Sequence, residues 1–167
     1  MAVEIEHKFL LISEEWRDLV SRSEVVRQGY LSNNPAASVR IRIANDQASL
    51  NIKGMTIGIH RPEYEYSIPW QDAVEMLNQL CARPLIEKTR HFLEFAGKTW
   101  EIDEFAGENL GLIVAELELT AISEYFQKPT WVGKEVSGIE RYYNVSLLTY
   151  PYSQWTEAEK TEHADAA

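Results

Sequence analysis

Charged side chains separated by a single residue recur along the extended segments of this 167-residue chain. In "VRIRI", Arg40 and Arg42 alternate with apolar residues, and in "EYEYSI" Glu63 and Glu65 alternate with tyrosines. Successive side chains of a strand point to opposite faces of its sheet, so each such pair shares one face. The chain is therefore expected to build a sheet with an apolar face and a face crowded with ions.

Alternation of this kind predicts eight strands. They cover residues 3–10, 24–32, 38–44, 47–54, 60–68, 86–96, 99–105 and 111–120. Apolar residues at helical spacing predict helices over 13–22, behind a Ser13 cap, and over 71–82, and a third helical region is expected within 139–149. These elements indicate an α+β architecture with a mostly antiparallel sheet.

The ionic face recurs in phase along the chain. Besides the two pairs above, it carries Glu4, Glu6 and Lys8 in "EIEHK", Lys53, Lys88, Arg90, Glu101, Asp103, Glu116 and Glu118. A sheet with one face in water is the simpler interpretation, and periodicity alone favours it. Like charges on neighbouring positions repel, however, which makes more sense if a third group compensates them.

Eight strands are also enough to close a barrel, which removes exposed sheet edges. The charged face would then line the lumen, and apolar residues such as Ile5 and Phe9 would point outward beneath the helices. Buried charges are tolerated only when partners or ligands compensate them. Arg and Lys suit phosphate oxygens, and clustered carboxylates suit Mg²⁺ or Mn²⁺, so we predict a metal-bound polyphosphate as the ligand.

Composition limits the function classes and the compartment. The net charge of −10 argues against nucleic acid as a partner. The single Cys81 indicates a reduced protein, and neither a signal peptide nor a membrane span is recognisable, so we expect a cytoplasmic protein that does not bind membranes. The length predicts one domain over residues 1–154, followed by an acidic and disordered tail over 155–167.

The ordered motifs resemble those of the CYTH family, the triphosphate tunnel metalloenzymes, and in particular its short bacterial inorganic triphosphatases. "EIEHK" matches the family's N-terminal Glu-x-Glu-x-Lys strand, and "VRIRI", "NIKG", "EYEYSIP", "EKTRHF", "WEIDEF" and "AELEL" follow in the family's order. The resemblance covers roughly residues 3–135. It implies a closed eight-stranded antiparallel tunnel that binds triphosphate groups together with a divalent metal.

The resemblance also implies roles for individual residues. It assigns phosphate binding to Lys8, Arg40, Arg42, Lys53, Lys88 and Arg90, with Lys134 near the tunnel mouth, and metal binding to Glu4, Glu6, Glu116 and Glu118. Four acids, Glu63, Glu65, Glu101 and Asp103, would bind metal through water, orient the attacking water or hold the basic side chains in place. Tyr30 would pair with Lys8 and assist cleavage of the phosphoanhydride.

The leading functional hypothesis is metal-dependent hydrolysis of inorganic triphosphate to pyrophosphate and phosphate. The alternatives are a nucleoside or thiamine triphosphatase, an adenylyl cyclase of the kind found in one branch of the family, and a non-catalytic module that binds polyphosphate or nucleotide. A homodimer is left open. The C-terminal segment, with Tyr142, Tyr143, Leu147 and Leu148, either plugs the tunnel or packs routinely, and the sequence slightly favours packing.

Overall fold

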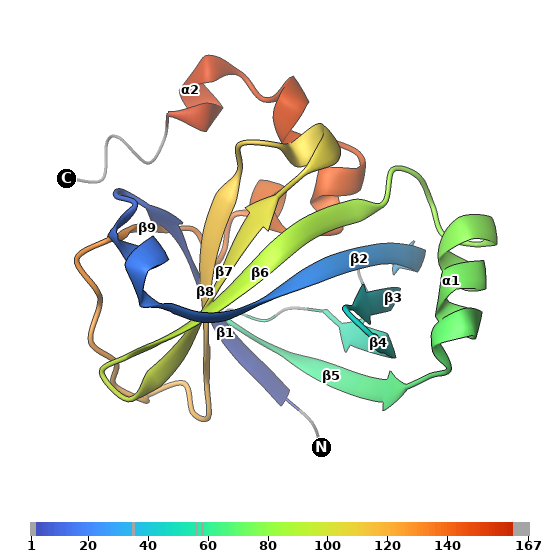
Figure 1. Cartoon of the computed structure of the whole chain (residues 1–167), viewed down its shortest axis with the longest axis horizontal. Helices are drawn as coiled ribbons and strands as arrows, with labels where there is room; N and C mark the ends of the chain where they lie inside the picture. The colour runs from blue at the N-terminus through green and yellow to red at the C-terminus, as the bar shows by residue number, and fades with distance from the viewer. Residues whose placement is uncertain (1–2, 35, 56, 58, 162–167) are drawn as a thin grey trace.

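The computed structural model describes residues 3–34, 36–55, 57 and 59–161. Its strands are β1 (Val3–Leu11), β2 (Val20–Asn34), β3 (Ala37–Ala44), β4 (Gln47–Gly54), β5 (His60–Ser67), β6 (Ile86–Phe95), β7 (Lys98–Phe105), β8 (Ile113–Leu119) and β9 (Val132–Glu135). Eight of them pair antiparallel in the order β5-β4-β3-β2-β6-β7-β8-β1, and a further pairing of β5 with β1 closes the ring (Figure 1). The predicted closed antiparallel barrel is confirmed.

One edge of β1 is shared between two partners. Near its start β1 pairs with β5, with Glu4 opposite Arg61, and towards its end it pairs with β9, with Phe9 opposite Glu135. Strand β9 is absent from the eight predicted strands and has only four residues. Gly133 allows this strand to approach closely, because a Cβ there would lie 2.6 Å from Cγ2 of Ile12.

The helix predictions were partly right. The predicted helix over 71–82 is α1 (Trp70–Gln79), which covers the outside of β3 and β4 (Figure 1). The helix over 13–22 is wrong: the segment forms a short 3₁₀ turn, η1 (Glu15–Leu19), and then enters β2 at Val20. Pairing of Val20 with Leu93 of β6 recruits this β-branched residue into the sheet, so tertiary contacts override the helical spacing.

The helical region expected within 139–149 consists of two single 3₁₀ turns, η3 (Glu140–Tyr142) and η4 (Ser146–Leu148). Further short turns are η2 (Gly107–Asn109), η5 (Tyr152–Gln154) and the helical turn α2 (Glu157–Lys160). Trp155 is buried, and Thr156 and Glu159 form a capping box on α2. The tail expected to be disordered therefore has ordered structure as far as residue 161, and residues 162–167 lie outside the described residues.

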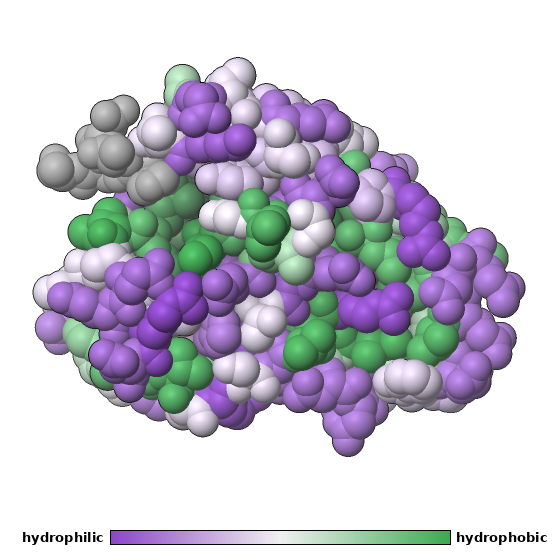
Figure 2. All heavy atoms as spheres, turned by 45° about the horizontal axis from the view of Figure 1, so that its top comes forward, coloured by the Kyte–Doolittle hydropathy of each residue, from purple (hydrophilic) through white to green (hydrophobic). Residues whose placement is uncertain are grey.

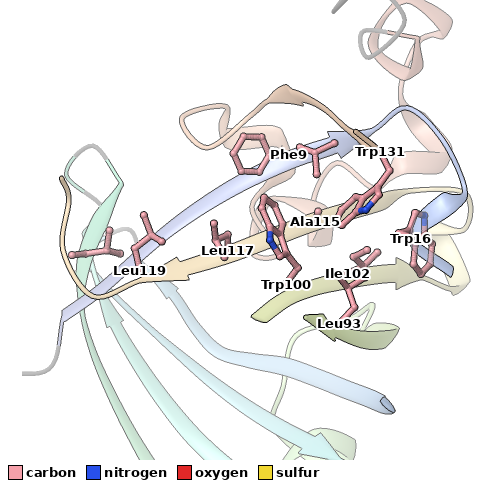
Figure 3. Packing of buried hydrophobic residues seen from close by; sticks show 11 residues of the cluster. Phe9, Trp16, Leu93, Trp100, Ile102, Ala115, Leu117, Leu119 and Trp131 are labelled. Atoms are coloured by element: carbon pink, nitrogen blue, oxygen red, sulfur yellow. The ribbon is translucent and has the colours of Figure 1, made fainter. Parts of the chain in front are cut away.

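Apolar side chains pack on the outside of the barrel wall, as predicted for Ile5 and Phe9. One cluster joins β1, β7 and β8 to the segment around Trp131, where Phe9, Trp100 and Leu117 gather (Figure 3). A second cluster holds the C-terminal segment, and a third lies under α1. The outer surface in Figure 2 mixes hydrophilic and hydrophobic residues. Among the helices of the described residues, none combines the length and apolarity that crossing a membrane requires.

Candidate functional site

The barrel encloses a cavity of about 200 Å³. Thirteen of the predicted site residues line it: Glu4, Glu6, Lys8, Tyr30, Arg40, Arg42, Lys53, Glu63, Glu65, Arg90, Glu101, Glu116 and Glu118. Residues two apart on each strand project to this one side, and antiparallel register places Lys8 opposite Glu116 and Glu6 opposite Glu118. The ionic face of the sheet thus points inward, and the interpretation in which it faces bulk water is wrong.

Glu116 on β8 is paired with two cations. Lys8 Nζ donates to Oε1 and Arg90 Nη2 donates to Oε2, both at 2.7 Å. Burial by itself would raise the pKa of Glu116, but the charges of Lys8 and Arg90 outweigh burial and hold this pKa well below its usual range. Glu116 therefore stays ionised and fixes the positions of two basic side chains.

Glu4 on β1 has a similar arrangement. Lys53 Nζ lies 2.9 Å from both carboxylate oxygens, and Arg61 Nε donates to Oε2 at 2.7 Å. Although burial opposes ionisation, the two cations lower the pKa of Glu4 to about 2. Arg61 has no role among the sequence predictions, although it shares the alternation phase of Glu63 and Glu65 on β5.

The four acids for which the sequence left several roles open also contact basic or amide groups. Asp103 and Lys88 form an ion pair whose side chains are both fully buried behind the cavity lining, and Arg90 Nε donates to Asp103 at 2.7 Å. Glu101 contacts Arg90, Glu63 lies 3.3 Å from Lys53 Nζ, and Asn51 donates to both Glu63 and Glu65. Of the roles proposed for these acids, holding basic side chains matches the contacts observed.

Two carboxylates differ from the others. Glu6 and Glu118 are directly opposed on β1 and β8, and within the described ranges neither accepts a hydrogen bond. The cation nearest to Glu6 is Lys8, whose Nζ lies 3.8 Å from Oε1. Burial, reinforced by the charge of Glu116, raises the pKa of Glu6 to about 7, and burial together with Glu4 raises the pKa of Glu118. Among the described residues, Glu6 has only this long ion pair with Lys8, which is hydrogen-bonded to Glu116, and Glu118 has no ion pair.

Two arginines on β3 show the opposite imbalance. Arg40 is 4% exposed, its buried Nε has no hydrogen-bond partner, and none of the described acids forms an ion pair with it. Arg42 Nε donates to Oε1 of Gln28 at 3.2 Å, and burial together with Arg40 and Arg90 lowers the pKa of Arg42 to about 10. In the closed ring β3 lies directly opposite β8, so these two arginines face Glu118 across the cavity, with Glu6 beside Glu118 on β1.

The other predicted residues are placed as follows. Lys8 and Tyr30 both line the cavity, but no hydrogen bond joins them in the described part of the chain. Lys88 and Asp103 lie behind the lining, and Lys134 lies on β9, outside the set that lines the cavity. Four further lining residues come from the C-terminal segment, which the sequence left open as a plug or as packing and to which it assigned no site role: Ser137, Tyr143, Asn144 and Val145. They follow no strand periodicity, so alternation gave no signal for them.

The charges that line the cavity nearly cancel. Six basic and seven acidic side chains are present, a net charge of −1. A polyanion would therefore have to enter with cations of its own. Among the described residues, no three acids, histidines or cysteines are grouped as a metal site, so protein ligands alone do not enclose an ion. Mg²⁺ is commonly held by one or two carboxylates plus phosphate oxygens and water, and Glu6 and Glu118 fit that limited contribution.

Comparisons with known proteins agree with this geometry. Residues 2–148 match the CYTH domain family. An inorganic triphosphatase of Acetivibrio thermocellus is 45% identical over 157 residues, covering 94% of this chain and all of the relative. The crystal structure of the inorganic triphosphatase NE1496 shares 29% identity with a TM-score of 0.64, covering 89% of this chain and 95% of that one. A conserved hypothetical protein of Pyrococcus furiosus, 22% identical with a TM-score of 0.57 over 72% of this chain and 80% of its own, shares the fold.

Proposed function

Because the chain belongs to the CYTH domain family, we propose that it hydrolyses inorganic triphosphate to pyrophosphate and phosphate with the help of a divalent cation. One observation carries this proposal. Across the cavity of the barrel, Arg40 and Arg42, which have no acidic partner among the described residues, face two weakly compensated carboxylates, Glu6 and Glu118. That arrangement is complementary to a phosphate chain that carries a metal ion on one side.

The phosphate side of this proposal rests on Arg40 and Arg42. A guanidinium donates in a planar fork that matches phosphate oxygens, and a buried one without a counter-ion is stabilised by an anionic ligand. Lys8, Lys53 and Arg90 would also contact phosphate, while Lys88 would act from behind Arg90. A chain of three phosphates could then be held along its whole length.

The metal side rests on Glu6 and Glu118. We propose that these two carboxylates hold Mg²⁺ or Mn²⁺, whose charge neutralises phosphate oxygens and favours attack by water. Glu4 and Glu116, which the family resemblance also assigns to metal, are occupied by basic side chains in this structure. In our proposal they position those bases and approach the metal only if Lys53, Arg61, Lys8 or Arg90 turns towards phosphate.

Hydrolysis breaks one bridging P–O bond and forms a new P–O bond to the water oxygen. The departing pyrophosphate gains negative charge as the bridge breaks, and a fixed cation near it lowers the barrier. We assign this role to Lys8, which Glu116 holds at 2.7 Å, with Tyr30 as its partner in assisting cleavage. Glu63, Glu65 and Glu101 remain our candidates for orienting the attacking water.

We also infer the setting in which the protein acts. Its free Cys81 and the net charge of −10 are consistent with a cytoplasmic protein that works on a small molecule without nucleic acid or membrane.

The test is phosphate release from inorganic triphosphate, ATP, GTP and thiamine triphosphate, each with Mg²⁺, Mn²⁺ or EDTA. We expect release from inorganic triphosphate with metal, slower release from the others and none in EDTA. Glu118→Gln should abolish release, whereas Glu75→Gln, a matched change on the exposed face of α1, should not alter it. Binding without release from any substrate would refute the proposal in favour of a binding module, and cyclic AMP formed from ATP would refute it in favour of a cyclase.

A further inference from the structure

Two amide side chains connect the C-terminal segment to the basic residues of the barrel. Gln28 on β2 is fully buried; its Oε1 accepts from Arg42 Nε and its Nε2 donates to Oδ1 of Asn144, each at 3.2 Å. Lys88 Nζ donates to the same Oδ1 at 3.4 Å. Asn144, which lies between η3 and η4, is thereby linked to two of the cations at the cavity.

The two donor-only residues at the ends of this network, Arg42 and Lys88, fix the direction of every hydrogen bond within it. Arginine and lysine carry donors only, so Gln28 must present its oxygen to Arg42, and Asn144 must present its oxygen to Lys88. The Nε2 of Gln28 then donates to Oδ1 of Asn144, which lies 3.2 Å away. Reversing the amide of Asn144 would set its NH₂ group against two donors, so its Nδ2 is directed away from both Lys88 and Gln28.

The Nδ2 of Asn144 carries two N–H donors, and it has no hydrogen-bond partner among the described residues. Asn144 lines the cavity, as do its neighbours Tyr143 and Val145. The segment is anchored on its other side, because Leu147 and Tyr142 are buried in the cluster that also contains Tyr30. Asn144 therefore brings to the cavity wall two neutral donors that have no partner among the described residues.

We propose that Asn144 is a substrate-binding residue whose Nδ2 donates to a phosphate oxygen of the triphosphate, and that Gln28 is the positioning residue for both Asn144 and Arg42. This inference rests on the proposed function, in that the ligand is a triphosphate. An amide suits this place, because it adds a hydrogen bond without adding a further cation beside Arg42, Lys88 and Arg90. The C-terminal segment then forms part of the binding site in addition to packing against the barrel.

The test compares Asn144→Asp and Asn144→Ala with Asn78→Asp, a matched change on the exposed side of α1. Aspartate keeps an acceptor for Lys88 and Gln28 but places a carboxylate oxygen where the donors were. We expect its KM for inorganic triphosphate with Mg²⁺ to rise about 10-fold to 100-fold, because a hydrogen bond to a charged group is lost. The alanine variant should show a rise of about 10-fold, while kcat changes little and Asn78→Asp behaves as the unaltered protein.

Urea unfolding of the same variants separates binding from docking of the segment. We expect Asn144→Asp to unfold at an unchanged or higher urea concentration, since its new charge pairs with Lys88, although its KM rises. An unaltered KM in Asn144→Asp would overturn the inference, because the residue would then only dock the segment. Gln28→Met, which removes both hydrogen bonds at similar volume, should raise KM as well, and a normal KM there would refute the positioning role.

Failure of the proposed function is recognised separately. If the unaltered protein binds inorganic triphosphate and Mg²⁺ in calorimetry but releases no phosphate, the proposed hydrolysis is wrong. The same Asn144 variants are then compared on the dissociation constant, and a weakening of about 10-fold or more still supports the inference, whereas equal dissociation constants overturn it.

Discussion

Replacing Glu6 with glutamine should stabilise the metal-free protein at neutral and alkaline pH. The folded barrel raises the pKa of this carboxyl group from 4.5 to about 7, first through burial and then through Glu116. The folded state therefore binds the proton more tightly than the unfolded state, and ionisation of Glu6 costs stability as the pH rises from about 4.5 to 7. Glutamine has a similar size and never ionises, so the variant does not lose this stability.

The expected gain in stability follows from the pKa shift of Glu6. At about 1.4 kcal/mol for each pH unit, a change from 4.5 to about 7 corresponds to at most about 3 kcal/mol. The side chain of Glu6 retains 21% exposure to the cavity, and hydration there reduces the effect, so we expect a gain of about 1 to 3 kcal/mol at pH 8. At pH 4 the carboxyl group is protonated in both states, and the gain should vanish.

Glu4→Gln, two residues earlier on the same strand, is the matched control with the opposite sign. The pKa of Glu4 is lowered to about 2 despite burial, because Lys53 and Arg61 outweigh it. Its ionised form contributes stability above about pH 4.5, and this contribution is lost as the pH falls towards 2. The glutamine variant should therefore be less stable than the unaltered protein at pH 8, by up to about 3 kcal/mol.

The assay is urea unfolding of both variants in EDTA at pH 4 and pH 8, followed by the same measurement with Mg²⁺ and pyrophosphate. The ligands should restore stability to the unaltered protein and much less to Glu6→Gln, because binding to the folded state alone stabilises it. The reasoning is refuted if Glu6→Gln is no more stable than the unaltered protein at pH 8 in EDTA, or if both substitutions shift stability in the same direction.

Two further substitutions compare the loss of an ion-paired charge with the loss of one that has no acidic partner among the described residues. A third tests the packing of β9 against β1. Asp103→Asn should destabilise the protein by about 3 to 5 kcal/mol in urea unfolding because it leaves the fully buried Lys88 without its counter-ion, whereas Arg40→Met should cost less than about 1 kcal/mol and still abolish triphosphate binding in calorimetry. If both substitutions destabilised the protein equally, the distinction between ion-paired and unpaired side chains would be wrong. Gly133→Ala should cost about 1 to 3 kcal/mol and speed hydrogen exchange at the Val136 amide, which bonds to the carbonyl of Lys8 at 2.8 Å; unchanged exchange would show that β9 accommodates the methyl group.

Alternation along single strands was enough to predict most of the cavity lining. The position of Arg61 on the cavity lining follows from the same two-residue period, although no role was predicted for it. The helix predicted over 13–22 does not form, although its apolar spacing suits a helix, because Val20 gains more from pairing with β6. Asn144 was out of reach, since it lies between two single 3₁₀ turns whose path depends on the cluster around Leu147.

The amino-acid sequence determined which side chains share a face, because the two-residue period of a strand is a local property of its backbone. It also determined that this face would be ionic. Pairing of the charges depends instead on the register between distant strands: Glu4 meets Lys53 and Arg61, whereas Glu6, two residues away, meets Glu118. The contacts of Glu4 exist only once β5 joins β1 and closes the barrel, so the contrast between these two glutamates is a property of the tertiary structure.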